Sequence, residues 1–180
     1  MITFIIALIP LLFISIPLVE KVEDINKSSF VQEFKEGFSL LKTTPGFLVL
    51  AIWSLIANFL LVPFNILLPY FVSITHSGAE SNLAVIIAFM HAGSITGALV
   101  ISLKKEWKRK VLILMASGAV TNVGLLIATF APFGQFLVMG IGEFIIGFTL
   151  ATGLPIYFTI LQTAVAPDKQ GRIFSIDATF

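Results

Sequence analysis

Long stretches without a charged residue limit most strongly what this sequence can fold into. About 20 apolar residues of α-helix, at about 1.5 Å each, cross a hydrocarbon core about 30 Å thick. Five stretches approach or exceed this length, and a single acidic residue interrupts one of them; they are 2–19, 45–73, 83–103, 111–130 and 135–161. A sixth begins near Ile173 and stops at Phe180. We therefore predict an all-α fold, a polytopic transmembrane helix bundle with five full spans and a truncated sixth.

Composition favours a lipid environment. Hydrophobic residues make up 57% of the chain and charged residues only 12%, far from the balance of a water-soluble domain. The absence of cysteine excludes disulfide frameworks, thiolate metal sites and cysteine nucleophiles. A signal peptide is the competing interpretation of 2–19, but no basic residue precedes the apolar run and Glu20 follows it directly.

Prolines interrupt two of the apolar stretches. Pro63 and Pro69 lie in the second stretch and Pro155 lies in the fifth. Proline lacks the backbone N–H that an inner helical turn needs, so a helix bends or ends near it. We expect the second stretch to be one tilted, bent crossing, and the fifth to bend in its final turns.

The basic residues predict the orientation in the membrane. All eleven Lys and Arg residues fall in three of the connections, 20–45, 104–110 and 163–172, whereas 74–82 and 131–134 contain none. Five spans place those three connections on one side, and an excess of Lys and Arg marks the cytoplasmic side. The sequence therefore predicts a multi-pass protein of the cell membrane with the three basic connections in the cytoplasm.

The chain divides into three parts on this pattern. Residues 1–19 form a transmembrane helix, 20–45 a cytoplasmic linker, and 46–180 a second transmembrane part. Within the linker, large apolar residues recur every three or four positions, which predicts an amphipathic surface helix; they are Phe30, Phe34, Phe38 and Leu41. A solvated linker that happens to contain phenylalanine is the alternative.

A short motif suggests a family. The segment 167–175 contains Pro167, Gly171 and Arg172 in the spacing Pro-x-x-x-Gly-Arg-x-x-Ser. This run, which follows the fifth span, resembles a signature found after helix ten in drug exporters of the major facilitator superfamily. The basic loop 104–110 is similar to the family's loop between helices eight and nine, although 103–106 supply neither its Gly nor its Asp.

The resemblance implies both an architecture and a function. The chain would cover roughly helices 6 to 11 of a twelve-helix permease of the drug- and macrolide-efflux-like branch, with 20–45 as the central linker. The implied function is secondary active transport, namely proton-coupled efflux of small hydrophobic or drug-like compounds. The expected partners are that substrate, protons, the lipid bilayer and the remainder of the permease. A non-transporting membrane scaffold or subunit, or an inactive truncated permease fragment, is the alternative.

No motif indicates an enzyme. The sequence contains no G-x-S-x-G elbow, H-E-x-x-H zinc motif, phosphate loop or dinucleotide fingerprint. Two isolated histidines and few carboxylates do not predict a metal site. We therefore expect no catalytic residue, no cofactor, no metal and no nucleic-acid partner.

Two ionisable residues inside the spans are candidates for a proton pathway. A carboxylate in hydrocarbon costs roughly 2.5 to 3.5 kcal/mol on insertion scales and usually faces a cavity or a partner, which makes Glu143 the first candidate. His91 is predicted at a similar depth, so the two side chains are candidates for a proton relay. The structural alternatives are a carboxyl group hydrogen-bonded across helices and a histidine bonded to a backbone carbonyl.

Amides and glycines are the other candidates. Asn58 and Asn65 are seven positions apart, so they share a helix face and are candidates to line a substrate path or to hydrogen-bond between helices. Asn122 is expected to have a structural role, because its span is peripheral in the family. Gly93 and Gly97 form a small-x-x-x-small pair that predicts close helix packing. Further glycines favour bending of the fifth span; they are Gly140, Gly142, Gly147 and Gly153.

Overall fold

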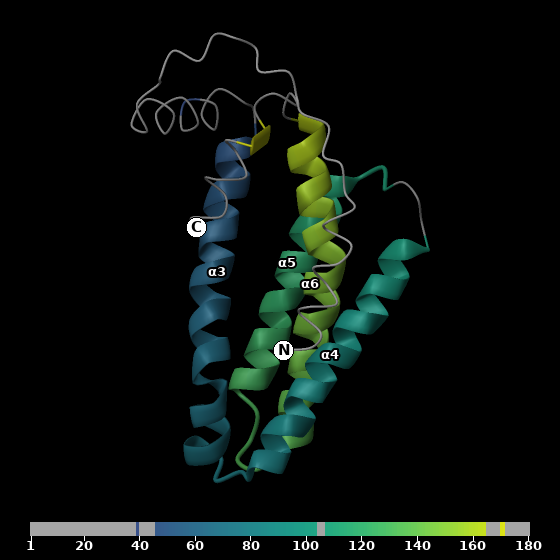
Figure 1. The fold of residues 1–180 in the computed structure, drawn as a ribbon. Helices are drawn as coiled ribbons and strands as arrows, with labels where there is room; N and C mark the ends of the chain where they lie inside the picture. Colours follow the sequence, from purple (N-terminus) through teal and green to yellow (C-terminus); the bar gives the residue numbers. More distant parts are fainter. Residues whose placement is uncertain (1–38, 40–45, 104–106, 165–169, 172–180) are drawn as a thin grey trace, which may run out of the picture. The chain divides into compact units, whose positions relative to one another are not determined.

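The computed structural model describes residues 39, 46–103, 107–164 and 170–171. The chain separates into two compact units, Met1–Glu33 and Phe34–Phe180, and all described helices belong to the second. They are α3 (Phe47–Tyr70), the π-helical turn η1 (Phe71–Thr75), α4 (Glu80–Ser102), α5 (Lys110–Thr129) and α6 (Phe136–Ala164) (Figure 1). Each follows an apolar stretch of the sequence, which confirms the predicted all-α fold.

Four segments are long and apolar enough to cross a membrane. One is Leu48–Thr75, which consists of α3 from its second residue together with η1. The other three are the helices α4, α5 and α6. These match four of the predicted spans. The span predicted at 2–19, the one beginning at Ile173, and the stripe predicted in 20–45 lie outside the described residues.

The prolines of α3 do not end the helix. Pro63 and Pro69 both lie within it, and the backbone widens into the π-helical turn two residues after Pro69. The hydroxyl of Ser73 donates to the carbonyl oxygen of Pro69 at 2.8 Å. A side-chain donor thus satisfies that carbonyl where the helical pattern changes.

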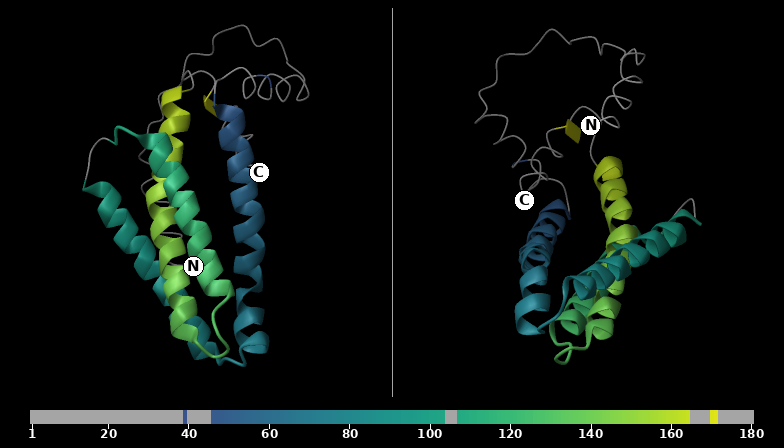
Figure 2. Two further views of the ribbon diagram at one scale, coloured as in Figure 1. Left: turned by 180° about the vertical axis from the view of Figure 1, so that it is seen from behind. Right: turned by 60° about the horizontal axis from the view of Figure 1, so that its bottom comes forward.

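Helix α6 is central among the described helices. It packs against both α4 and α5 (Figure 2), and half of its most apolar segment is buried, against 6% for α3. The contact with α4 depends on small residues, because Gly93 and Gly97 lie against the backbone carbonyl groups of Phe144 and Phe148. The predicted packing role of these two glycines is confirmed.

The glycines of α6 serve close helix contacts. A Cβ on Gly142 would lie 2.6 Å from the carbonyl oxygen of Gly124 on α5, and a Cβ on Gly147 would meet the carbonyl oxygen of Met90 on α4. A Cβ on Gly140 would lie 3.1 Å from the Phe89 ring. Close approach of neighbouring backbones therefore explains residues that we had associated with bending of the span.

Helix α3 touches its neighbours at its two ends. Near its start, Leu50 packs in a buried cluster with Leu114 of α5 and with residues near the end of α6. Near its end, Leu68 and Val72 pack with Ile86 of α4 and Met139 of α6. The middle of α3 is therefore held close to α5 and α6 from both sides.

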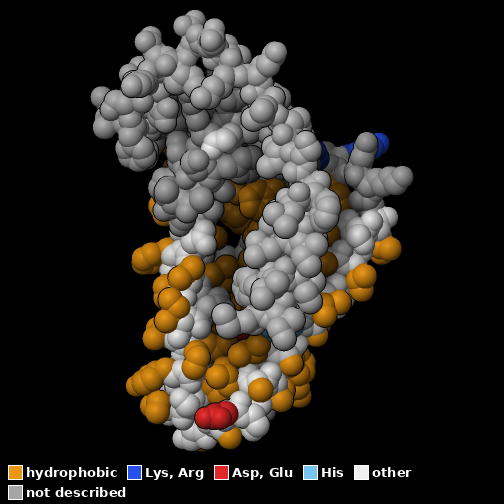
Figure 3. All heavy atoms as spheres, viewed as in Figure 1, with side chains coloured by type: hydrophobic (Ala, Val, Ile, Leu, Met, Phe, Trp, Pro, Cys, Tyr) orange, Lys and Arg blue, Asp and Glu red, His pale blue; other side chains and the backbone are white. Residues whose placement is uncertain are grey.

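The exposed charged residues lie at the ends of this arrangement, whereas Glu143 is buried within α6. Lys108 and Arg109, just before α5, are exposed, as is Glu80 in the first turn of α4. Figure 3 shows basic side chains at one end of the visible face, an acidic one at the other, and hydrophobic side chains between. We call the end with Lys108 and Arg109 the basic end and the other the opposite end. Such a distribution suits helices that span a bilayer.

Candidate functional site

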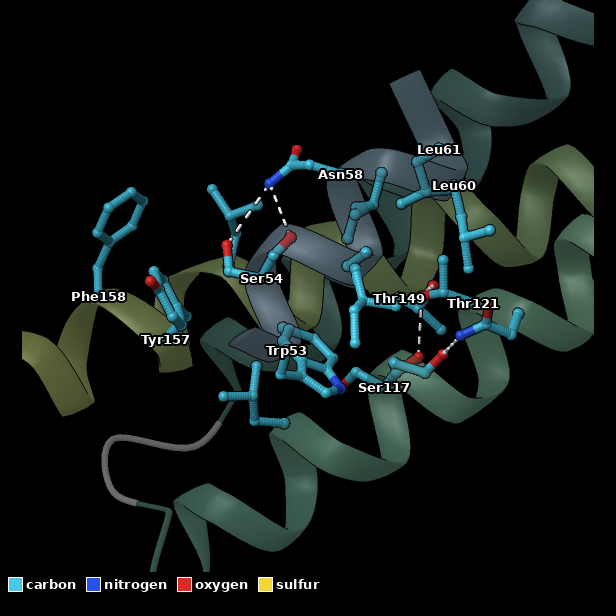
Figure 4. Close-up of a pocket in the computed structure, with 18 residues that line it drawn as sticks. Trp53, Ser54, Asn58, Leu60, Leu61, Ser117, Thr121, Thr149, Tyr157 and Phe158 are labelled. Atoms are coloured by element: carbon cyan, nitrogen blue, oxygen red, sulfur yellow. Dashed lines mark hydrogen bonds between the residues drawn. The ribbon is translucent and has the colours of Figure 1, made fainter. Parts of the chain in front are cut away.

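A cavity of about 260 Å³ lies between α3, α5 and α6. It occupies the segment of the bundle between the two clusters that hold the ends of α3. Its lining combines aliphatic and aromatic side chains with uncharged polar ones, the latter being Ser54, Asn58, Ser117, Thr121, Asn122 and Thr149 (Figure 4). No Asp, Glu, Lys, Arg or His is among the described residues that line it.

An aromatic ring forms part of the cavity wall through a contact that requires glycine. Trp53 of α3 lies against Gly118 of α5, and the ring occupies the space that a Cβ at Gly118 would fill. Figure 4 shows Trp53 projecting from α3 towards the helix that carries Ser117. At the basic end, Tyr157 lines the cavity and also belongs to the buried cluster around Leu50.

The two asparagines of the cavity each donate an amide N–H to a carbonyl oxygen of their own helix. Asn58 donates to the carbonyl oxygen of Ser54 at 3.1 Å, and Asn122 donates to that of Gly118 at 2.8 Å. A glutamine or asparagine amide also carries an acceptor oxygen. Each asparagine therefore contributes an acceptor to the cavity lining while its nitrogen is bonded to its own helix.

Glu143 lies on the same face of α6 as the cavity. It precedes Leu150 by seven residues and Tyr157 by fourteen, which places all three on one stripe of the helix. The rise from Leu150 to Glu143 is about 10 Å towards the opposite end. The side chain is only 1% exposed, and neither carboxylate oxygen has a hydrogen-bond partner in the part of the chain that the structure describes.

His91 does not pair with Glu143. It lies on α4 about 200° around the helix from Gly93, which faces α6, and its side chain is exposed. The carboxylate oxygens of Glu143 are without a partner among the described residues. The structure therefore does not bring these two side chains together, because the packing of Gly93 against α6 turns His91 away from that helix.

The remaining predicted residues lie in different surroundings. Asn65 is exposed, donates to the carbonyl oxygen of Leu61 at 2.9 Å and is not among the cavity-lining residues. Gly171 lies exposed in a helical segment with Gln170, whose side-chain amide donates to the carbonyl oxygen of Gln162 at 2.9 Å. Pro167 and Arg172 lie outside the described residues.

Sequence reasoning missed part of the cavity. Asn122 was expected to be structural, yet it lines the cavity. Its intramembrane amide was the available signal, and the comparison with a peripheral helix of the family outweighed it. The contact between Trp53 and Gly118 left no such signal, because it joins residues far apart in the chain. Within the described ranges, no three His, Cys, Asp or Glu residues gather as a metal site would require.

Apolar spans packed through glycine contacts, with a cavity between three of them, define a polytopic helical membrane protein. The Major Facilitator Superfamily matches the sequence over residues 1–180, and the chain belongs to this family. The family resemblance inferred from the motif is thereby confirmed. Members of this family are generally transporters rather than enzymes, in agreement with the sequence prediction.

Curated relatives carry a more specific name. Macrolide efflux protein A of Enterococcus faecalis is 23% identical over 173 residues, which cover 96% of this chain and 53% of the relative. Macrolide efflux protein A of Streptococcus pyogenes is 22% identical over 173 residues, covering 96% of this chain and 42% of the relative. The chain thus spans about half the length of these relatives. No solved structure gives a significant match.

Proposed function

We propose that this chain forms part of the substrate path of a proton-coupled exporter of small hydrophobic or drug-like compounds. The observation that carries the proposal is the placement, on one face of α6, of an uncharged cavity and of a buried carboxyl group without a hydrogen-bond partner among the described residues. The name of its relatives, macrolide efflux protein A, favours efflux over uptake. The basic connections would then face the cytoplasm.

The cavity lining supports an uncharged or weakly charged substrate. Ligand sites combine a mainly apolar wall with a few polar groups that orient the ligand, and the lining of Trp53, Tyr157 and neutral hydroxyl and amide groups has this character. Its volume of about 260 Å³ is slightly below the usual range of about 300–1,000 Å³ for such sites. In the complete permease, further helices would contribute the remainder of the binding space.

Glu143 is the proposed proton carrier. An ionisable group in the membrane is costly and marks a functional site by default, and no described hydrogen bond gives this one a structural role. The substrate and proton sites lie about two helical turns apart on α6. A shift of α6 against α4 and α5 would therefore act on both sites, as alternating access requires.

The test is proton-driven transport by the full-length protein in liposomes. Radiolabelled erythromycin, a macrolide, is the probe, and its transport is measured with and without an imposed pH gradient. Glu143→Gln is expected to abolish the accumulation driven by the gradient while preserving exchange of labelled for unlabelled probe. Glu80→Gln removes an exposed carboxylate at the end of α4 and serves as the matched control, with transport unchanged.

Two results would contradict the proposal. Gradient-driven accumulation by Glu143→Gln at the wild-type rate would show that this carboxyl group does not carry the proton. Absence of flux in the wild type, in protein that inserts and remains folded, would instead favour a membrane scaffold or subunit whose helices only pack.

A further inference from the structure

His76 is a buried residue that the proposed transport cycle does not use. It directly follows η1 at the opposite end of the bundle and is only 5% exposed. Three phenylalanine rings surround it. The ring of Phe71 meets it edge-on with centroids 4.7 Å apart, Phe133 stacks at 6.0 Å with an interplanar angle of 12°, and Phe136 lies at 6.3 Å.

A hydrogen bond accepted by this imidazole joins two connections distant in sequence. The backbone N–H of Gly134 donates to Nδ1 of His76 at 3.3 Å. Gly134 belongs to the connection between α5 and α6, whereas His76 belongs to that between η1 and α4. Since Nδ1 accepts this bond, it carries no proton, and the neutral ring holds its proton on Nε2.

The backbone around the histidine leaves little room for adjustment. Gly134 has a φ of +72°, a conformation that residues with a side chain rarely adopt. A Cβ on Gly78 would lie 2.7 Å from the Phe136 ring. Phe136 is the first residue of α6. The contacts of His76 therefore fix the point at which α6 begins.

We infer that His76 is a proton-sensitive positioning residue, whose hydrogen bond with Gly134 holds the start of α6 against the connection before α4. A protonated imidazole carries hydrogen on both ring nitrogens, so Nδ1 and the Gly134 N–H become two donors facing each other. The bond is then lost and the contact must open.

The surroundings offer no described anion to hold the charged ring in place. The residues with a described ring contact or hydrogen bond to His76 are Phe71, Phe133, Phe136 and Gly134, and none of them is titratable. Glu80, exposed in the first turn of α4, is the nearest charged residue along the described chain.

The consequence for transport rests on the proposed function. Glu143 lies seven residues after Phe136 on α6, so release of the start of α6 would loosen the turns that position this carboxyl group. Opening of the contact between His76 and Gly134 does not depend on transport and is measured without substrate.

The test uses the absence of cysteine from the sequence. Nitroxide labels are placed at two exposed positions of the full-length protein, Ser81→Cys in the first turn of α4 and Gln135→Cys in the connection before α6. Distances between the labels are then measured by pulsed electron resonance at pH 8 and pH 5.5. We expect one narrow distance at pH 8 and a longer, broader population at pH 5.5.

Variants of His76 separate proton uptake from other effects of acid. His76→Gln keeps an acceptor that does not titrate and should give the narrow distance at both pH values. His76→Phe keeps a ring without an acceptor and should give the broad distribution at both. Glu80→Gln should respond to pH as the wild type does. Identical wild-type distances at the two pH values, or an equal acid response in His76→Gln and His76→Phe, would overturn the inference whatever the transport assay shows.

Discussion

The hydroxyl oxygens of Thr121 on α5 and Thr149 on α6 lie 2.7 Å apart and share a hydrogen bond between the two helices. Each hydroxyl also lies within bonding distance of a carbonyl oxygen of its own helix, Ser117 for Thr121 and Ile145 for Thr149. A hydroxyl carries one proton, so one threonine donates across the helix interface and the other donates to its own backbone. Both residues line the cavity, so the bond also fixes the wall of the site.

Removing this bond should weaken the bundle by a small, measurable amount. Thr121→Val and Thr149→Val keep the side-chain shape and remove the hydroxyl. A double-mutant cycle on thermal unfolding in detergent should give a coupling of about 0.6 kcal/mol, the average for hydrogen bonds between membrane helices. Thr96→Val, at an exposed threonine bonded only to Ala92 of its own helix, is the control. Strict additivity of the two substitutions would show that the bond contributes nothing.

Substitutions of two glycines in α6 should differ in severity. A Cβ at Gly147 would meet the backbone carbonyl oxygen of Met90, which cannot rotate away, whereas at Gly153 the nearest atom is the Ser117 Cβ at 3.3 Å. We expect Gly147→Ala to destabilise the protein by about 1–3 kcal/mol, as overpacking does, and Gly153→Ala to change stability much less. Melting of fluorescent fusion proteins in detergent measures both. Equal losses would mean that the α4–α6 contact is looser than the structure shows.

The sequence allowed the helices to be predicted because lipid imposes a length and an apolar composition on every span. The four described spans follow from that rule alone. The π-helical turn after Pro69 did not, since proline indicates an irregularity without specifying its form. The role of the α6 glycines was also missed, because a glycine that permits bending and one that permits close packing look alike until the facing helix is known.

The cavity was only partly predictable for a related reason. Seven-residue spacing placed Asn58 and Asn65 on one face, but Asn58 lines the cavity and Asn65 does not. Periodicity gives the direction of a side chain around its own helix and leaves the neighbour at that depth undetermined. Periodicity was insufficient for His91 as well. Its depth in the span suggested that it lies beside Glu143, but its direction around α4 turns it away from α6.

Substitutions of Asn122 and Asn65, which make the same kind of local hydrogen bond, should differ in their effect on ligand binding. Asn122 and Asn65 each donate to a carbonyl oxygen of their own helix, at 2.8 and 2.9 Å, but only Asn122 is among the described cavity-lining residues. Replacing Asn122 with Leu removes an acceptor from the lining, and one hydrogen bond of about 1 kcal/mol corresponds to about fivefold in affinity.

Equilibrium binding of labelled erythromycin to the purified full-length protein measures this difference. Asn122→Leu should raise the dissociation constant about fivefold, and Asn65→Leu should leave it near the wild-type value. If both variants bind as the wild type does, the cavity between α3, α5 and α6 is not where this probe binds.

Labelling of single cysteines should establish which end of the bundle faces the cytoplasm. Gln135 and Lys108 are exposed at opposite ends, and the excess of basic residues predicts that the Lys108 end is cytoplasmic. A membrane-impermeant maleimide applied to intact cells should therefore label Gln135→Cys, and should label Lys108→Cys only after the membrane is opened. The cysteine-free parent gives the background, and Ser81→Cys should repeat the result for Gln135→Cys. The reverse pattern would place the basic end outside.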